Sequence, residues 1–153
     1  MIITLEALQE MWQRHECPLL QGVLHLDLGY FPVQVESTCH GAFDYRFTHS
    51  VAAPLPLSAI AGLDCTSIDV FASADSKHGT VKCGEGTQGG DGFVALESQD
   101  GTLIWVAFFR NSNPFMKLRI EGNDAIATSE YGNPWIFPLD SPQSLRILSP
   151  LEE

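Results

Sequence analysis

The sequence contains one uninterrupted apolar run of seven residues, Leu103-Ile-Trp-Val-Ala-Phe-Phe109, and this run restricts the possible folds most strongly. It is far shorter than the roughly 20 apolar residues that a membrane-spanning helix needs. A short apolar run bounded by turn residues is typical of a buried strand. Because this strand would have no polar face, we expect it to be central, with both of its faces covered.

The residues before this run predict an antiparallel hairpin. A second apolar segment, residues 93–97, is separated from the run by a turn that contains Gln99, Asp100 and Gly101. Asp-Gly between apolar segments is a strong hairpin signal, because both central residues of the tightest turn take positive φ. We therefore expect residues 93–97 and 103–109 to be neighbouring strands.

Period-two alternation predicts many other short strands. Residues 115–121 alternate strictly, with Met116, Leu118 and Ile120 directed inward. Residues 42–47 alternate in the same way, with Phe43, Tyr45 and Phe47 on one face. Strands are also expected at 22–28, 31–36, 68–72, 80–83, 125–129, 135–139 and 145–148, and a short helical turn at 58–63. Pro32 predicts that its strand lies at a sheet edge, or that the strand begins there.

One helix is predicted, over residues 4–16. Its apolar positions recur at intervals of three and four, and they are Leu5, Leu8, Trp12 and His15. Thr4 is a suitable N-cap, and the helix should end before Pro18. We expect the Trp12 side of this amphipathic helix to pack on a sheet.

These elements predict an α+β fold, mostly an antiparallel β meander with one N-terminal helix packed on the sheet. The chain has 153 residues, which fits a single domain spanning residues 1–153. The residues between the strands include no linker and no internal repeat. Helix content should stay well below a third.

The charge balance excludes several classes of partner. Eight Lys and Arg residues against nineteen Asp and Glu residues give a net charge of −11. Nucleic acids and anionic membranes both require clustered cations, so neither is expected as a partner. The first sixteen residues have no basic segment followed by an apolar one, so we expect no signal peptide and a cytoplasmic location.

The cysteine and histidine pattern predicts no metal site. The pairs His15 with Cys17 and Cys39 with His40 could together supply four zinc ligands. Their spacing does not match that of known zinc sites, and C-x-x-C is absent from the sequence. We expect all four cysteines to be reduced and to act as small hydrophobic residues, and the histidines of these pairs to be capping or surface residues.

A glycine-rich segment, residues 84–89, matches the pattern G-x-G-x-x-G. In dinucleotide-binding folds a helix begins at this pattern and its amides meet the pyrophosphate. Here another glycine-rich turn and a predicted strand follow, so we expect an acidic hairpin loop and no cofactor. Because no nucleophile elbow or triad signature occurs around Ser37, Cys39 and His40, we predict no catalytic residues and a protein that is not an enzyme.

The distribution of acids predicts a binding surface. Two long stretches, between Arg46 and Lys77 and between Lys82 and Arg110, contain several acids and no cation. The acids expected on exposed loops, and therefore the candidate partner-binding residues, are Asp75, Glu85, Asp91 and Asp100. Such acids favour a basic partner and increase mainly its association rate.

Three segments of the C-terminal third suggest a family. They are residues 100–109, residues 112–115 (Ser-Asn-Pro-Phe) and residues 132–139 (Gly-Asn-Pro-Trp-Ile-Phe-Pro-Leu). Together, over about residues 93–148, the chain resembles the small immunity proteins encoded beside bacterial polymorphic toxins. The resemblance implies a cytoplasmic, non-enzymatic protein that neutralises a cognate toxin domain, and it carries over no catalytic residue.

Two alternatives stay open. The chain could be a small-molecule-binding or regulatory β domain, with its site at the mouth of the sheet near Tyr131 and Trp135. It could also be an uncharacterised hydrolase, because a fold by itself excludes no function.

Overall fold

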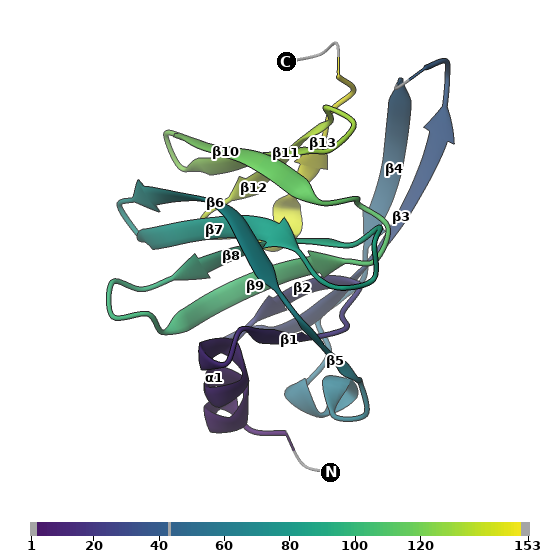
Figure 1. Cartoon of the computed structure of the whole chain (residues 1–153). Helices are drawn as coiled ribbons and strands as arrows, with labels where there is room; N and C mark the ends of the chain where they lie inside the picture. Colours follow the sequence, from purple (N-terminus) through teal and green to yellow (C-terminus); the bar gives the residue numbers. More distant parts are fainter. Residues whose placement is uncertain (1–2, 43, 151–153) are drawn as a thin grey trace.

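The computed structural model describes residues 3–42 and 44–150, and Figure 1 shows its arrangement. The first half contains α1 (Leu5–Gln13), β1 (Glu16–Pro18), β2 (Gly22–His25), β3 (Gly29–Cys39), β4 (Tyr45–Val51), the 3-10 turn η1 (Leu57–Ile60) and β5 (Cys65–Ser67). The second half contains β6 (Asp69–Ser76), β7 (Gly79–Glu85), β8 (Gly92–Glu97), β9 (Leu103–Phe109), β10 (Phe115–Glu121), β11 (Asp124–Ser129), β12 (Pro134–Pro138), the 3-10 turn η2 (Pro142–Ser144) and β13 (Arg146–Ile147).

The strands form three antiparallel sheets. The largest has seven strands in the order β4-β3-β2-β9-β8-β7-β6, so β9 is its central strand. A second sheet has the order β10-β11-β12-β13, and β1 pairs with β5. The predicted α+β class, with an antiparallel sheet and an N-terminal helix, is therefore confirmed.

Side chains from the two faces of β9 enter two different cores. Trp105, Ala107 and Phe109 belong to the core between the seven-stranded and the four-stranded sheet. Val106 and Phe108 belong to the core on the opposite face, which also contains residues of α1, β1 and η1. The predicted burial of both faces of this strand is therefore confirmed.

The helix begins as predicted and ends earlier. The hydroxyl oxygen of Thr4 accepts a hydrogen bond from the Ala7 N–H, and Trp12 is buried as expected. The chain leaves the helix after Gln13 because Glu16 must reach its pairing partner Ser67 on β5. His15 makes this exit with a φ of 59°, so its side chain is exposed and is not part of the apolar stripe; that prediction is wrong.

The turn between β8 and β9 is not of the predicted type. Gly101 takes a φ of 87°, but Asp100 is not among the residues with positive φ. The Gly101 N–H donates to the Ser98 carbonyl at 3.0 Å, and the Ser98 N–H donates to the Thr102 carbonyl at 2.8 Å. The turn is therefore longer than the predicted one. Only Gly101 takes a positive φ in it, so Asp100 does not need to.

Two further strand predictions need correction. β3 lies between β2 and β4, so the strand that contains Pro32 is not at the sheet edge. Pro32 is tolerated because β4 ends beside it, and its carbonyl accepts from the Ala52 N–H just beyond β4. The strand predicted at 42–47 begins at Tyr45, and Phe43 lies outside the described residues.

Gly84→Ala tests the close packing of β7 against β6. A Cβ on Gly84 would overlap the backbone carbonyl oxygen of Asp69, which cannot rotate away. We expect this variant to lower the free energy of unfolding by about 1–3 kcal/mol. Gly62→Ala is the matched control, because nothing lies within 4 Å of the added methyl group. Urea unfolding followed by tryptophan fluorescence measures both, and equal midpoints would contradict the packing.

Candidate functional site

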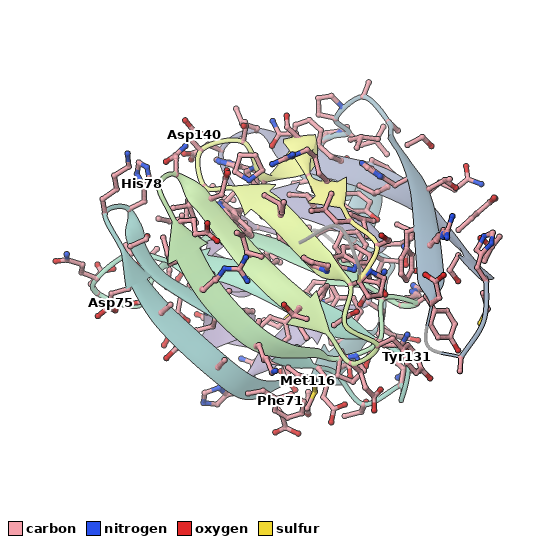
Figure 2. All side chains as sticks on the ribbon, turned by 90° about the horizontal axis from the view of Figure 1, so that it is seen from above. Phe71, Asp75, His78, Met116, Tyr131 and Asp140 are labelled. Carbon is pink, nitrogen blue, oxygen red and sulfur yellow. The ribbon has the colours of Figure 1, made fainter. Side chains whose placement is uncertain are left out.

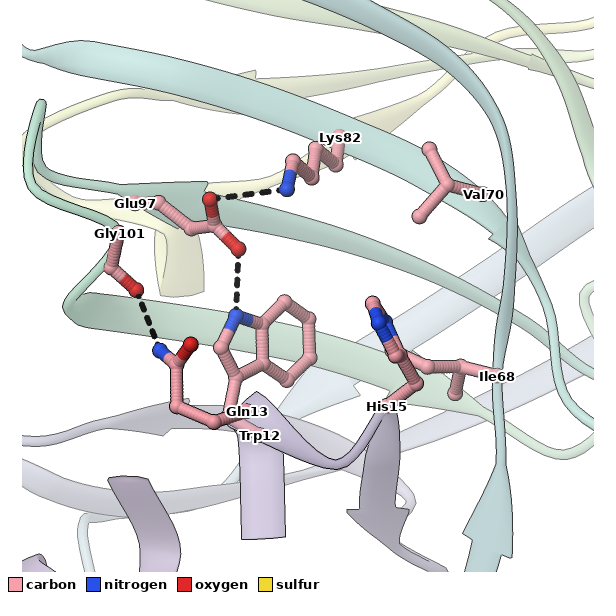
Figure 3. A pocket seen from close by; sticks show the side chains of 8 residues that line it. All are labelled: Trp12, Gln13, His15, Ile68, Val70, Lys82, Glu97 and Gly101. Atoms are coloured by element: carbon pink, nitrogen blue, oxygen red, sulfur yellow. Dashed lines mark hydrogen bonds and ion pairs between the residues drawn. The ribbon is translucent and has the colours of Figure 1, made fainter. Parts of the chain in front are cut away.

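A hollow of about 200 Å³ opens between α1 and the seven-stranded sheet (Figure 3). It is named here the Trp12 hollow and is lined by Trp12, Gln13, His15, Ile68, Val70, Lys82, Glu97 and Gly101. The lining residues belong to α1, β6, β7 and β8 or lie within a few residues of their ends. Segments far apart in the sequence therefore meet at this position.

A buried carboxylate, that of Glu97, lines the hollow. The Trp12 indole N–H donates to Glu97 Oε2 at 2.6 Å, and Lys82 Nζ lies 3.0 Å from Glu97 Oε1. The Glu97 side chain is only 10% exposed, whereas that of Lys82 is 30% exposed. Since a buried charge is costly without partners, these two contacts hold Glu97 in a defined position.

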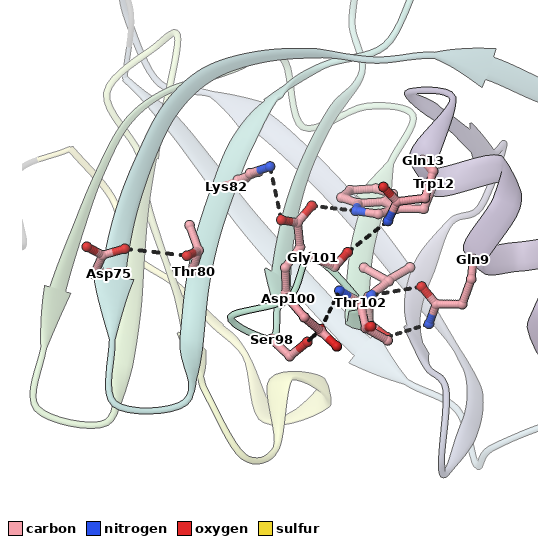
Figure 4. Close-up of polar contacts among 12 residues, drawn as sticks. Gln9, Trp12, Gln13, Asp75, Thr80, Lys82, Ser98, Asp100, Gly101 and Thr102 are labelled. Atoms are coloured by element: carbon pink, nitrogen blue, oxygen red, sulfur yellow. Dashed lines mark hydrogen bonds and ion pairs between the residues drawn. The ribbon is translucent and has the colours of Figure 1, made fainter.

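The helix is fixed against the β8–β9 hairpin by side chains on either side of Trp12. The Gln9 amide donates to the Leu103 carbonyl and accepts from the Leu103 N–H, both at 2.9 Å. Gln13 donates to the Gly101 carbonyl at 2.9 Å (Figure 4). The Trp12 ring also packs edge-on against Phe93, with 6.0 Å between the ring centres. These contacts preorganise the hollow.

The size and chemistry of the hollow favour one protein side chain as its ligand. Small-molecule pockets usually measure about 300–1,000 Å³, which is more than this hollow offers. Lys82 and Glu97 present a cation and a carboxylate side by side, next to an aromatic wall. Such a surface can receive one large polar or charged side chain of a partner.

Two of the four predicted acids lie on elements around Glu97, although neither of them lines the hollow (Figure 4). Asp75 on β6 accepts from the Thr80 hydroxyl at 3.4 Å, and Thr80 shares the face of β7 that carries Lys82. Asp100 lies in the β8–β9 turn beside Gly101. Hydrogen bonds from the Ser98 hydroxyl and from Thr102 lower the pKa of the Asp100 carboxyl.

The other two predicted acids lie elsewhere. Alternation along β7 places Glu85 on the face opposite to Lys82, where it stands directly across from Asp69. Asp91 is completely buried, so the prediction that it lies on an exposed rim is wrong. Its carboxylate accepts from the Gly86 N–H at 3.1 Å and from the Gln88 N–H at 3.2 Å. The glycine-rich loop needs an internal acceptor for these amides, and Asp91 supplies it.

The same contacts explain the G-x-G-x-x-G segment. Amides that would meet a pyrophosphate in a dinucleotide-binding loop are donated to Asp91 instead. Gly86 lies so close to the Asp91 carboxylate that a side chain there would overlap it. The chain then enters β8 at Gly92, where a dinucleotide-binding fold would begin a helix.

The cysteines are all free thiols and are dispersed. Cys17 and Cys83 are buried in the two different cores, while Cys39 and Cys65 are exposed. Over residues 3–42 and 44–150, no three His, Cys, Asp or Glu side chains come close enough together to hold a metal ion.

The alternative site near Tyr131 and Trp135 is not formed as predicted. Trp135 is completely buried and packs against Phe109 and Phe115, with ring centres 4.9 and 5.3 Å apart. Tyr131 stacks on Tyr45 at 4.3 Å. The Trp135 indole therefore cannot line the mouth of a pocket.

The sequence did not indicate that Trp12, Lys82 and Glu97 come together in one candidate site. The sequence contained one indication of this site. Glu97 follows Phe93 by four residues and Ala95 by two, so on a strand the three side chains lie on one face, and that face is buried. The partners that a carboxylate on that face would need, Trp12 and Lys82, come from other elements and have no shared motif.

Comparison of the chain with protein families, with curated proteins and with solved structures finds no match. In the described part of the chain, no helix combines the length and the apolar character that crossing a membrane would require.

Lys82→Met tests the charge pair. It leaves the Glu97 carboxylate buried without its cation, and we expect the free energy of unfolding to fall by about 1–2 kcal/mol. Adding Glu97→Gln should restore most of this loss, because the amide oxygen still accepts from Trp12 and carries no charge. Lys117→Met, at an exposed position, is the control. Urea unfolding provides the measurement, and purely additive losses in the double variant would contradict the coupling.

Thiol labelling tests the burial of the cysteines. Burial raises the pKa of the Cys83 thiol to about 12 and also raises that of Cys17. The thiolate is the reactive form, so at pH 8 we expect a disulfide reagent to label Cys39 and Cys65 in the folded protein. Cys17 and Cys83 should react only after unfolding. Mass spectrometry of the labelled peptides identifies the sites, and rapid labelling of all four would contradict the two-core arrangement.

Proposed function

We propose that this chain is a toxin-neutralising immunity protein, which binds a cognate bacterial toxin domain and blocks it without catalysis of its own. The observation that carries the proposal is the Trp12 hollow, with its fixed Glu97–Lys82 pair and room for one large side chain. Interfaces concentrate binding energy in such preformed, partly desolvated pockets.

The charge of the chain supports a basic partner. The net charge is −11, Asp75 and Asp100 add carboxylates on the elements around Glu97, and Lys82 is already paired with Glu97. A cationic toxin domain would therefore meet a complementary field, which raises the association rate and suppresses wrong partners. Many toxin domains that act on nucleic acid would offer such a surface.

The rigidity of the site also supports this role. The hydrogen bonds of Gln9 and Gln13 hold α1 against the β8–β9 hairpin before any partner arrives. Preorganisation lowers the entropy cost of association and so leaves more of the contact energy for affinity. The free thiols suit a reducing compartment, and we propose that the protein acts in the cytoplasm.

Charge reversal tests this function. The probe is the purified C-terminal domain of a polymorphic toxin encoded immediately upstream of the gene. We expect a stable complex with the unaltered chain. In Asp75→Lys with Asp100→Lys, the association rate should fall about tenfold at low salt, and its salt dependence should weaken.

The control changes the net charge equally at other exposed positions, through Asp27→Lys with Glu36→Lys. Stopped-flow or surface-based kinetics across a salt series measures both variants. Absence of a complex with the unaltered chain would refute the proposed function. An equal loss in both variants would refute the site while leaving a general charge effect.

A further inference from the structure

Two β-bulges expose large apolar side chains. In β6 the register with β7 shifts between Val70 and Ala72, so Phe71 is the extra residue. In β10 the register with β11 shifts between Phe115 and Lys117, so Met116 is the extra residue. Phe71 is 42% exposed and Met116 is 46% exposed, so the prediction that Met116 is directed inward is wrong. Bulges redirect side chains at sheet edges, and here both redirect an apolar one outward.

The two bulges lie at the same border of the molecule. β6 is an edge of the seven-stranded sheet and β10 is an edge of the four-stranded sheet, and these strands run side by side without pairing. Figure 2 shows Phe71 and Met116 together at this border. Val70, also 42% exposed, precedes Phe71. These three residues are named here the apolar corner.

The apolar corner is not needed to fill the cores. The residues that follow the bulges, Ala72 and Leu118, face the core between the two large sheets. Single exposed apolar residues are common on protein surfaces, whereas contiguous apolar patches are typical of interaction sites. Three adjoining residues exposed where two sheet edges meet therefore indicate a surface that a partner protein would cover.

The charges beside the corner indicate what covers it. Asp69 and Glu85 stand directly opposite each other in the β6–β7 register, and like charges at such positions are unfavourable. Lys117 is the cation next to Met116, so the β10 side of the corner is basic, whereas Asp69 and Glu85 make its β6 side acidic. A partner with an apolar side chain flanked by cations would complement this surface.

The corner is also continuous with the candidate site. Val70 lines the Trp12 hollow and is followed directly by Phe71. A partner seated in the hollow would therefore extend over the edge of β6 onto the corner. The hollow would fix the orientation of the partner, and the corner would supply apolar area to bury.

We propose that Phe71 and Met116 form the apolar centre of the interface, and that they receive an apolar side chain of a basic partner protein whose cations face Asp69 and Glu85. This inference rests on the proposed function and adds the position and the chemistry of the main contact. Buried apolar and aromatic side chains usually carry most of the binding energy, while rim charges change mainly the association rate.

The experiment measures dissociation of the complex with the same upstream toxin domain, using Phe71→Ser with Met116→Ser. We expect dissociation to become at least tenfold faster, while the urea unfolding midpoint falls no further than in the control, whose side chains are exposed to a similar extent. The matched control is Leu28→Ser with Leu55→Ser, at positions 53% and 42% exposed and outside the corner. The control should dissociate at the normal rate.

A second variant keeps the test valid if serine in a bulge disturbs folding. Met116→Lys alone places a cation at the corner, and it should weaken the complex at least tenfold without lowering the unfolding midpoint. A complex that forms normally with both corner variants would overturn this inference and leave the proposed function intact. If the unaltered chain forms no complex, the proposed function fails and this inference fails with it.

Discussion

Burial of both faces of β9 is the constraint on which the rest of the structure depends. Trp105 and Phe109 face the four-stranded sheet, while Phe108 faces the core beside α1, and all three are fully buried. Burying one such side chain contributes about 1.5–3 kcal/mol, so neither face can be left in water. One sheet layer and one helical layer are therefore both required. The indole N–H of Trp105 finds its acceptor in the Leu139 carbonyl at 2.9 Å, which also anchors the end of β12.

The cover of the second face creates the candidate site. α1 must lay Trp12 on the sheet, and the indole N–H then needs an acceptor away from water. Glu97 supplies it, and Lys82 balances the charge of Glu97. Asp91 solves a similar problem with the amides of the glycine-rich loop. Asp91 thus stabilises a loop, whereas Glu97 lines an open hollow, where it can face a partner.

The surface chemistry follows from the way the two large sheets meet. β6 and β10 end their sheets side by side, and bulges keep their exposed edges irregular. Irregular edges discourage uncontrolled strand pairing, which is a general hazard of edge strands. In this chain the same bulges contain Phe71 and Met116, so the irregularities that protect the sheet edges also expose the residues of the proposed contact. Asp69 and Glu85 beside the corner would face the cations of the proposed basic partner.

The sequence by itself determined the local elements: the helix with its Thr4 cap, the buried strand 103–109, the strand at 115–121 and the antiparallel class. Such features depend on neighbours within a few residues, whose side-chain periodicity is written in the chain. The alternation predicted for 115–121 is interrupted by the bulge at Met116. The exit from the helix at His15, the pairing of β2 with β9, the burial of Asp91 and the meeting of Trp12, Lys82 and Glu97 were decided only by the tertiary structure. Each of these features either joins segments that are distant in the sequence or provides a partner for a buried polar group. Burial and pairing across the whole fold set their positions, and no local pattern records which segments will meet.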